Sequence, residues 1–305
     1  MMTDILAAHE LTPGGRFDQW RPNRISYVLS DVDGTLVGTE RLASPSVVAA
    51  CQALRASGVR FGIATGRMRH ATAALRTQLG TDGPHIHFDG AMVHDGDRAI
   101  ARQTLQAPHV DALIRIAARK PYTYLELYDA DNYYVDVLDE RARSHWDMLE
   151  RPPAGLVASS ADLAGVSVVK ATIVVFDSDD AEIDAVADDI ANAGLRAGPS
   201  TSPRTPTLAY LNVTNLDASK GAALSCAAKH LGVVPATIAV LGDAPNDLPM
   251  FAVAGTSIAM GQAHATVRNH AHLVAPPVDR DGAAAALDAL RSMVVQANYV
   301  DPGTV

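Results

Sequence analysis

Cysteine, lysine and aromatic residues are all scarce in this chain. Its 305 residues include two cysteines, Cys51 and Cys226, which predicts reduced, buried thiols and argues against a structural disulfide. Lysine occurs at four positions, aromatic residues make up 5%, and the net charge is −9. No block of basic residues interrupts that acidic balance, so nucleic acids and anionic membranes are not expected partners.

Long apolar runs are also missing. No run approaches the roughly 18 residues that a membrane-spanning helix needs. The segment 1–20 has neither a basic start nor a sustained apolar stretch, so it does not resemble a signal peptide. We therefore expect a cytoplasmic protein with no membrane partner. The composition carries no signal for an oligomeric state.

What the chain does contain is ample core material, at 48% hydrophobic residues. Its length predicts about two domains, because one core rarely grows beyond roughly 250–300 residues. Strand-length apolar runs alternate with helical segments near both ends of the chain, which is typical of an α/β sheet. The strands expected from these runs lie at 25–31, 59–66, 85–90, 237–243, 256–260 and 272–277.

The middle of the chain has a different rhythm. The segment 123–137 predicts two antiparallel strands around a turn at 129–132, and helices are expected at 107–120, 139–150 and 177–194. We interpret 91–211 as an inserted α+β domain, and 25–90 together with 212–305 as the α/β core. The segment 1–24 contains Pro13, Gly14, Gly15 and Pro22, shows little periodicity, and is interpreted as an N-terminal extension.

Polar clusters follow the predicted core strands or open a helix. Asp31 and Asp33 follow the first strand, Thr65 follows the second, Lys220 opens a helix, and the segment GDAPND at 242–247 follows a later strand. Ligands bind at the carboxyl ends of the strands in an open parallel sheet. The clusters are therefore expected to converge on one site, although they lie far apart in sequence.

The residue types in these clusters suit phosphoryl chemistry. Asp31 and Asp33 are i and i+2 in an extended segment and so share a side. One carboxylate can attack phosphorus while the other acts first as an acid and then as a base. Clustered carboxylates call for a hard divalent cation such as Mg²⁺. Gly34 allows a sharp turn near the phosphate, and Thr65 and Lys220 offer a hydroxyl and a positive charge.

Together these motifs resemble the haloacid dehalogenase-like superfamily of phosphohydrolases. The resemblance rests on DVDGTL at 31–36, ATGR at 64–67, SKGAAL at 219–224 and GDAPNDLPMF at 242–251. Their detail is most similar to the Cof-type subfamily, class IIB. The resemblance covers 25 to about 297. It implies a Rossmann-like three-layer α/β core with a mainly parallel sheet, plus an inserted α+β cap domain that selects the substrate.

The resemblance also implies roles for individual residues. Asp31 is the expected nucleophile, which forms an aspartyl-phosphate, and Asp33 is the expected acid and base. Thr65 and Lys220 complete the catalytic set. The expected phosphate- and substrate-binding residues are Gly34, Thr65, Gly66, Arg67, Lys220 and Asn246. The Mg²⁺ ligands are expected to be Asp31, the backbone carbonyl of Asp33, and Asp243, with Asp247 behind them.

These patterns predict a Mg²⁺-dependent phosphatase of small phosphorylated metabolites, such as sugar phosphates. Two alternatives stay open on the residues alone: a phosphomutase or phosphotransferase on the same scaffold, and a phosphate-binding protein without catalysis. Arg67 is equally compatible with a substrate contact and with a structural ion pair. Many relatives have Asn-Gly-Ala where this chain has Asp89-Gly90-Ala91, which leaves the role of Asp89 open.

Overall fold

The computed structural model describes residues 9–10 and 25–300, except 150, 178, 202–204 and 206. The predicted N-terminal extension therefore lies outside the described residues, apart from 9–10. Contacts divide the chain into two compact units. Unit 1 holds 1–66, 72–101 and 219–305, and unit 2 holds 67–71 and 102–218.

Unit 1 is built on a parallel sheet. Within the described residues this sheet has six strands in the order β1-β14-β13-β12-β2-β3, and neighbouring strands pair in parallel. The strands are β1 (His9–Glu10), β2 (Tyr27–Ser30), β3 (Arg60–Ile63), β12 (Ile238–Gly242), β13 (Thr256–Ala259) and β14 (Leu273–Val274). The predicted parallel sheet is thus confirmed.

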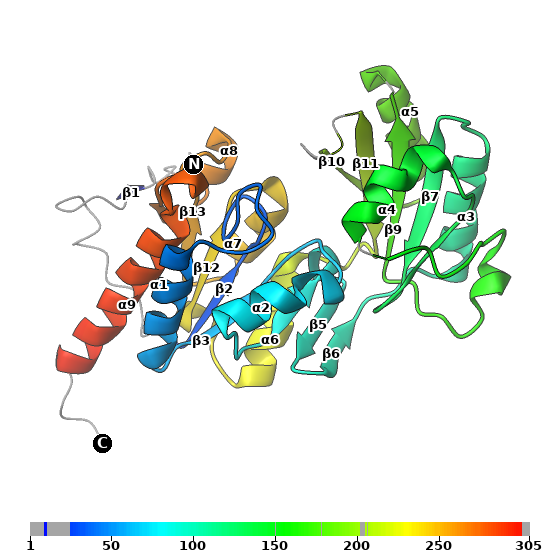
Figure 1. Cartoon of the computed structure of the whole chain (residues 1–305). Coiled ribbons are helices and arrows are strands. Elements are labelled where there is room, and N and C mark those ends of the chain that lie inside the picture. Colours follow the sequence, from blue (N-terminus) through cyan, green and yellow to red (C-terminus); the bar gives the residue numbers. More distant parts are fainter. Residues whose placement is uncertain are drawn as a thin grey trace, which may run out of the picture. The chain divides into compact units, whose positions relative to one another are not determined.

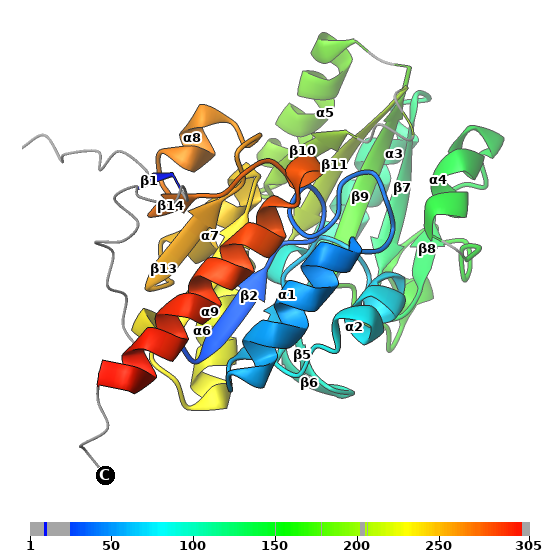
Figure 2. The same cartoon turned by 60° about the vertical axis from the view of Figure 1, so that its left-hand side comes forward.

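Helices cover both faces of this sheet (Figures 1 and 2). One group comprises α1 (Pro45–Ala56), α2 (Ala73–Leu79) and α9 (Gly282–Val300); the other comprises α6 (Lys220–Leu231), α7 (Leu248–Phe251) and α8 (Ala265–Arg268). Successive strand residues feed opposite cores: Val28 packs in the core shared with α1 and α9, whereas Leu29 packs in the core shared with α6 and α7. This alternation produces the predicted three-layer α/β core.

Local signals explain where two of these helices start. Ser44 caps α1 by accepting the Val47 N–H at 3.2 Å, and Pro45 occupies the first helical position. Ser219 caps α6 in the same way, through the Ala222 N–H at 3.1 Å. That cap places Lys220 at the first position of α6, where its side chain turns into the core unit.

The third predicted strand differs from expectation. β4 (His85–His87) lies beside the end of β3, where Ala64 and Ile86 form an isolated parallel bridge and the Ile63 N–H donates to Nδ1 of His85 at 3.2 Å. Its ladder partner, however, is the antiparallel strand β5 (Met92–Asp95). A further strand, β6 (Arg98–Arg102), completes this three-stranded sheet. β5 and β6 were not predicted from the sequence, although the two residues between them, Gly96 and Asp97, are typical of a tight hairpin turn.

Unit 2 contains an antiparallel sheet. Within its described residues five strands run in the order β10-β11-β9-β7-β8. The strands are β7 (Thr123–Tyr128), β8 (Tyr133–Val135), β9 (Lys170–Phe176), β10 (Ala197–Thr201) and β11 (Leu208–Thr214). The predicted antiparallel pairing around the turn at 129–132 is confirmed. The sequence reading missed β10 and β11.

The two faces of the unit 2 sheet differ in chemistry. Apolar side chains such as Leu125 and Ile173 pack with those of α3 (Ala107–Ala118) and α5 (Asp180–Asn192). On the other face, the fully buried Glu126 carboxylate accepts hydrogen bonds from the hydroxyls of Tyr124 and Tyr128. His145 of α4 (Arg143–Leu149) contacts the same carboxylate at 3.0 Å. These contacts give the buried carboxylate of Glu126 its hydrogen-bond partners.

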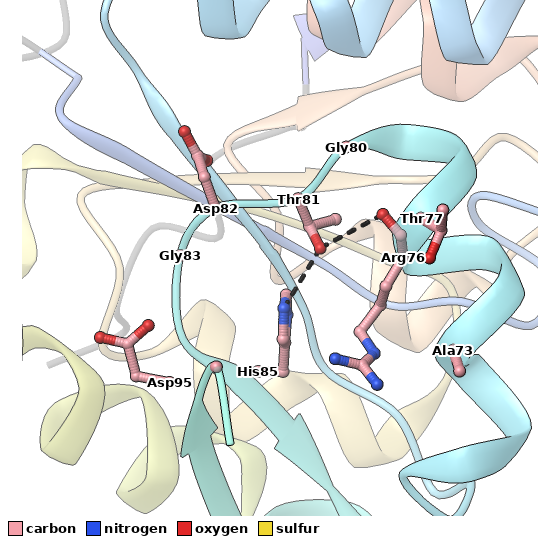
Figure 3. Close-up of a pocket in the computed structure, with 10 residues that line it drawn as sticks. Ala73, Arg76, Thr77, Gly80, Thr81, Asp82, Gly83, His85 and Asp95 are labelled. Atoms are coloured by element: carbon pink, nitrogen blue, oxygen red, sulfur yellow. Dashed lines mark hydrogen bonds between the residues drawn. The ribbon is translucent and has the colours of Figure 1, made fainter. Parts of the chain in front are cut away.

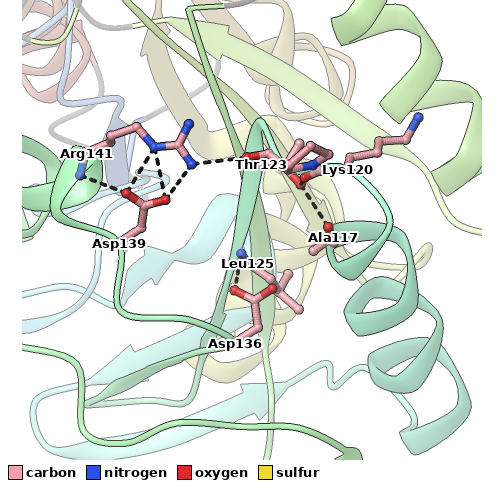
Figure 4. Close-up of polar contacts among 8 residues, drawn as sticks. Ala117, Lys120, Thr123, Leu125, Asp136, Asp139 and Arg141 are labelled. Carbon is pink, nitrogen blue, oxygen red and sulfur yellow. Dashed lines mark hydrogen bonds and ion pairs between the residues drawn. The ribbon is translucent and has the colours of Figure 1, made fainter.

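Charged side chains also fix the edges of the unit 2 sheet (Figure 4). Asp136 follows β8 and accepts the Leu125 N–H at 2.8 Å, which extends the β7–β8 pairing through a side chain. Arg141 forks onto Asp139, lies over the Phe176 ring at 4.2 Å, and donates to the Pro121 carbonyl. These contacts hold the segment that leads into α4.

Candidate active site

The loop after β2 presents the first two carboxylates. Asp31 is buried, and its N–H continues the β2–β12 ladder by donating to the Leu241 carbonyl at 2.9 Å. Asp33 is exposed and its backbone bridges to Val37. The turn from Asp33 to Val37 is closed by a hydrogen bond from the Gly34 N–H to the Val37 carbonyl at 2.8 Å. Asp31, at the end of β2, is therefore buried, whereas Asp33, in the loop that follows, is exposed to solvent.

Gly34 is the point where this loop meets the loop after β12. It has φ +81°, and a Cβ built there would lie 2.2 Å from Oδ2 of Asp243. Only glycine fits, for reasons of both backbone conformation and space. The Gly34 carbonyl accepts from Nε2 of Gln262 at 2.6 Å, and Thr35 donates to Asp243 at 3.4 Å. The sequence reading missed Gln262, which lies in an ordinary loop far along the chain.

We predict that Gly34→Ala disrupts the site more than it disrupts the fold. The methyl group would displace the Asp243 carboxylate, and alanine disfavours the positive φ. Activity is expected to fall at least about tenfold, while stability falls by about 1–3 kcal/mol. The measurement is kcat/KM beside a thermal melt. The matched control is Gly38→Ala in the same loop, where an added Cβ meets nothing within 4 Å. Equal losses in both variants would contradict this prediction.

Lys220 is the cation at the centre of the cluster. Its side chain is 1% exposed, and its Nζ donates to Oδ1 of Asp31 and to Oδ1 of Asp247, both at 2.6 Å. Burial by itself would lower the pKa of Lys220, but the carboxylates of Asp247 and Asp31 outweigh burial and raise it above the ordinary value. Lys220 therefore carries its positive charge at any physiological pH.

Asp247 organises the loop after β12. Its Oδ2 accepts the N–H groups of Asp243 and Ala244 at 2.9 and 3.0 Å, while its Oδ1 accepts from Lys220. A Cβ on Gly242 would lie 2.5 Å from the Asp247 carboxyl, so this loop also needs glycine. Asp247 is completely buried. It holds both Lys220 and the backbone on which Asp243 is mounted.

The remaining predicted residues are divided between the two units of the chain. Thr65 follows β3, is 1% exposed, and donates its N–H to the Ile86 carbonyl at 2.9 Å; Gly66 comes next. Asn246 is exposed and donates through Nδ2 to Oδ1 of Asp89 at 3.0 Å. Arg67, by contrast, groups with unit 2. The structure thus joins Asp89, which the sequence left without a role, to a predicted site residue.

Carboxylates cluster tightly enough to hold a metal ion. One oxygen from each of Asp31, Asp243 and Asp247 can lie within 4.8 Å of the others. Burial raises the pKa of Asp31, with Lys220 opposing and the neighbouring acids adding to the rise. Burial and the Asp247 charge likewise raise the pKa of Asp243 to about 6. Excess buried negative charge on oxygen ligands fits a hard divalent cation, which would relieve that repulsion.

Two other features lie apart from this cluster. His85, His87 and His94 are buried side chains of β4 and β5 whose rings contact one another edge to face, and they are absent from the group of metal-ligating side chains found among the described residues. A cavity of about 440 Å³ opens at the start of β4, where Thr81 contacts His85 (Figure 3). Its lining includes none of the predicted site residues.

Comparison with known proteins gives a consistent family. The model of the haloacid dehalogenase-like hydrolase family matches residues 28–287. The chain therefore belongs to the haloacid dehalogenase-like hydrolase family. It is 25% identical over 286 residues to the 5-amino-6-(5-phospho-D-ribitylamino)uracil phosphatase YwtE of Bacillus subtilis, covering 86% of this chain and 96% of that protein. A phosphoglycolate phosphatase of Archaeoglobus fulgidus is 42% identical over 79 residues, which are 26% of this chain and 35% of that protein.

Solved structures agree on the fold. The subclass IIB sugar phosphatase BT4131 superposes with a TM-score of 0.71 at 24% identity, covering 86% of this chain and 97% of its own. TM0651 of Thermotoga maritima gives a TM-score of 0.73 at 21% identity, covering 87% and 97%. The predictions of this family, of its fold with a cap domain, and of a phosphatase enzyme are confirmed. No helix in the described part of the chain is both long and apolar enough to cross a membrane.

Proposed function

We propose that the protein is a Mg²⁺-dependent phosphatase that hydrolyses small phosphorylated metabolites through an aspartyl-phosphate on Asp31. The observation that carries this proposal is the buried Lys220, which holds the Asp31 carboxylate at 2.6 Å inside a group of metal-ligating acids. A protein that only bound phosphate would have no need to expose a second carboxylate, Asp33, beside the first. Relatives named as phosphatases support the same reaction.

Each residue has a distinct part in the proposed reaction. An Asp31 oxygen attacks phosphorus and the ester oxygen leaves, taking a proton from Asp33. Asp33 then removes a proton from water, which attacks the aspartyl-phosphate and releases inorganic phosphate. Thr65, Gly66, Lys220 and Asn246 are proposed to hold the phosphoryl oxygens. Lys220 also keeps Asp31 oriented, because it donates to that carboxylate directly.

The proposed metal ligands are Asp31, the Asp33 carbonyl and Asp243, with Asp247 behind them. Asp247 suits that supporting position, since three hydrogen bonds from Lys220 and the 243–244 backbone already engage its two oxygens. When bound, Mg²⁺ would neutralise the acids and polarise the phosphoryl group. Without added positive charge, the surplus of carboxylates would repel a phosphate dianion.

Unit 2 is proposed to be the cap that selects the substrate. It holds most of the insert predicted at 91–211, but 91–101 belong to unit 1 and 212–218 belong to unit 2. Its sheet has one apolar face and one face on which the buried side chains of Tyr124, Glu126 and Tyr128 hydrogen-bond to one another. Arg67 belongs to this unit and is proposed as a substrate contact. Sugar phosphates are the proposed substrate class, in keeping with the fold shared with the sugar phosphatase BT4131. The free thiols of Cys51 and Cys226 support a cytoplasmic setting.

The proposal is tested by phosphate release over sugar phosphates, nucleotides, pyridoxal phosphate and flavin mononucleotide. Steady release of inorganic phosphate is expected with Mg²⁺ and without an acceptor sugar. A mutase would instead keep water from the aspartyl-phosphate and rebind a phosphorylated sugar intermediate. Chelation should abolish the activity, and Ca²⁺ should inhibit it, because Ca²⁺ accepts more ligands and a looser geometry than Mg²⁺ and can occupy both Asp31 oxygens. Full activity in excess chelator would refute the metal requirement. No release across the whole panel would refute the phosphatase.

A further inference from the structure

The turn after β4 has a backbone that few residues adopt. Phe88 and Asp89 both have positive φ, at 53° and 54°, and Gly90 follows at 107°. Positive φ is uncommon outside glycine, and two such residues in succession need support from their surroundings. Aspartate tolerates this conformation better than most residues. The Asp89 side chain therefore points in a different direction from that of a residue in an extended strand.

Three loops of the candidate site meet at this turn. The Asp89 N–H donates to the Thr65 carbonyl at 3.1 Å, and Asn246 donates through Nδ2 to the Asp89 carboxylate at 3.0 Å. A Cβ on Gly66 would lie 2.9 Å from Oδ2 of Asp89, so the carboxylate rests against the Gly66 backbone. Asp89 therefore touches the loop after β3 and the loop after β12 at once.

The third segment at this junction is the start of α6, at Ser219 and Lys220. A Cβ on Gly90 would lie 2.2 Å from the Ser219 carbonyl carbon and 2.8 Å from the Lys220 nitrogen, so the turn packs directly on the residue before the buried lysine. Only glycine allows so close an approach. The negative charge of Asp89 also helps to raise the pKa of Lys220.

The chemistry of the contact fixes which way the Asn246 amide faces. An ionised carboxylate only accepts hydrogen bonds, so Asp89 selects the nitrogen of the amide and turns its oxygen away. One N–H of Nδ2 is then committed to Asp89, and the second N–H and Oδ1 keep a fixed direction. An exposed asparagine would otherwise sample both amide orientations.

We propose that Asp89 is a positioning residue that acts through Asn246, fixing the amide so that one defined donor faces the phosphoryl group. This inference rests on the proposed phosphatase function and deepens it, because it names the residue that orders the phosphate-binding side of the site. Asp89 itself takes no part in bond making or breaking.

The test is a double-mutant cycle on kcat/KM for p-nitrophenyl phosphate with Mg²⁺. Asp89→Gly removes the carboxylate while keeping a residue that accepts positive φ, so the turn is expected to fold. Asp89→Gly and Asn246→Ala are each expected to lower kcat/KM about tenfold, and the double variant should also lose about tenfold, because coupled neighbours are not additive. Asp89→Asn tolerates the left-handed turn and keeps one acceptor, but its amide also donates and can pair with either end of the Asn246 amide, so its kcat/KM should lie between those of Asp89→Gly and the wild type. The thermal midpoint of Asp89→Gly should stay near that of the wild type.

Asp95→Asn is the matched control, since it removes a carboxylate of the same three-stranded sheet that pairs with His230. Its activity is expected to equal that of the wild type. Losses that multiply to about a hundredfold in the double variant would overturn the positioning role. So would an Asp89→Gly variant with full activity, or one whose loss is explained by a lower thermal midpoint. A wild type that releases no phosphate would instead overturn the proposed function, and the positioning role with it.

Discussion

Replacing Asp31 with asparagine is expected to abolish turnover while leaving the protein folded. The amide is nearly isosteric with the carboxylate but is a far poorer nucleophile, and loss of a covalent nucleophile typically costs about 10⁴-fold or more. The fold should persist because the amide oxygen can still accept from Lys220, which now donates to Asp31 at 2.6 Å. Phosphate release and a thermal melt measure the two effects separately.

Asp95→Asn serves as the control here too, because it changes the same charge without touching the candidate site. Near-wild-type turnover in Asp31→Asn would exclude covalent catalysis by this residue. Loss of folding together with activity would show instead that the carboxylate is needed chiefly as the partner of Lys220.

Replacing Asp33 with asparagine is expected to separate substrates by their leaving groups. A sugar alkoxide needs a proton to depart, whereas nitrophenolate leaves readily without one. General acid–base catalysis is typically worth about 10²–10⁴-fold, so formation of the aspartyl-phosphate should slow by that range for sugar phosphates and much less for p-nitrophenyl phosphate. Hydrolysis of the intermediate also needs Asp33, now as a base. A rapid-quench burst of about one nitrophenolate per enzyme, then slow turnover, is the expected readout.

Equal slowing for both leaving groups, with no burst, would mean that Asp33 mainly shapes the metal site. The exposed position of Asp33 agrees with a proton shuttle, because an acid and base must reach both the leaving group and water. Asp31, by contrast, is 6% exposed and bound to Lys220.

The core of the fold was predictable because its strands are short, apolar and followed by helix signals. β2 and β12 are buried on both faces, so they appear in the sequence as continuous apolar runs. β10 was missed for the opposite reason: it runs through Gly198 and Pro199 at the edge of its sheet, and both residues are poor strand formers. An edge strand tolerates glycine and proline because the backbone groups on its outer side do not pair with another strand.

The site could be assembled from sequence only in part. Asp31 and Lys220 lie 189 residues apart, yet strand-end logic brought them together, and they meet at 2.6 Å. Asp89 and Gln262 carried no such signal. Asp89 reaches Asn246 because of a left-handed turn, and Gln262 reaches the Gly34 carbonyl from a loop after β13. Contacts of this kind depend on the tertiary positions of loops, which local pattern does not specify.

Detection of phosphate bound covalently to Asp31 tests the central claim most directly. Acid quenching during the first turnover of p-nitrophenyl phosphate by the Asp33→Asn variant, followed by peptide mass spectrometry, should find a hydroxylamine-sensitive phosphoryl group on the peptide that carries residue 31. The Asp31→Asn variant should show none under the same conditions. Phosphate on a different residue, or rapid nitrophenolate release with no phosphorylated peptide at all, would contradict the account.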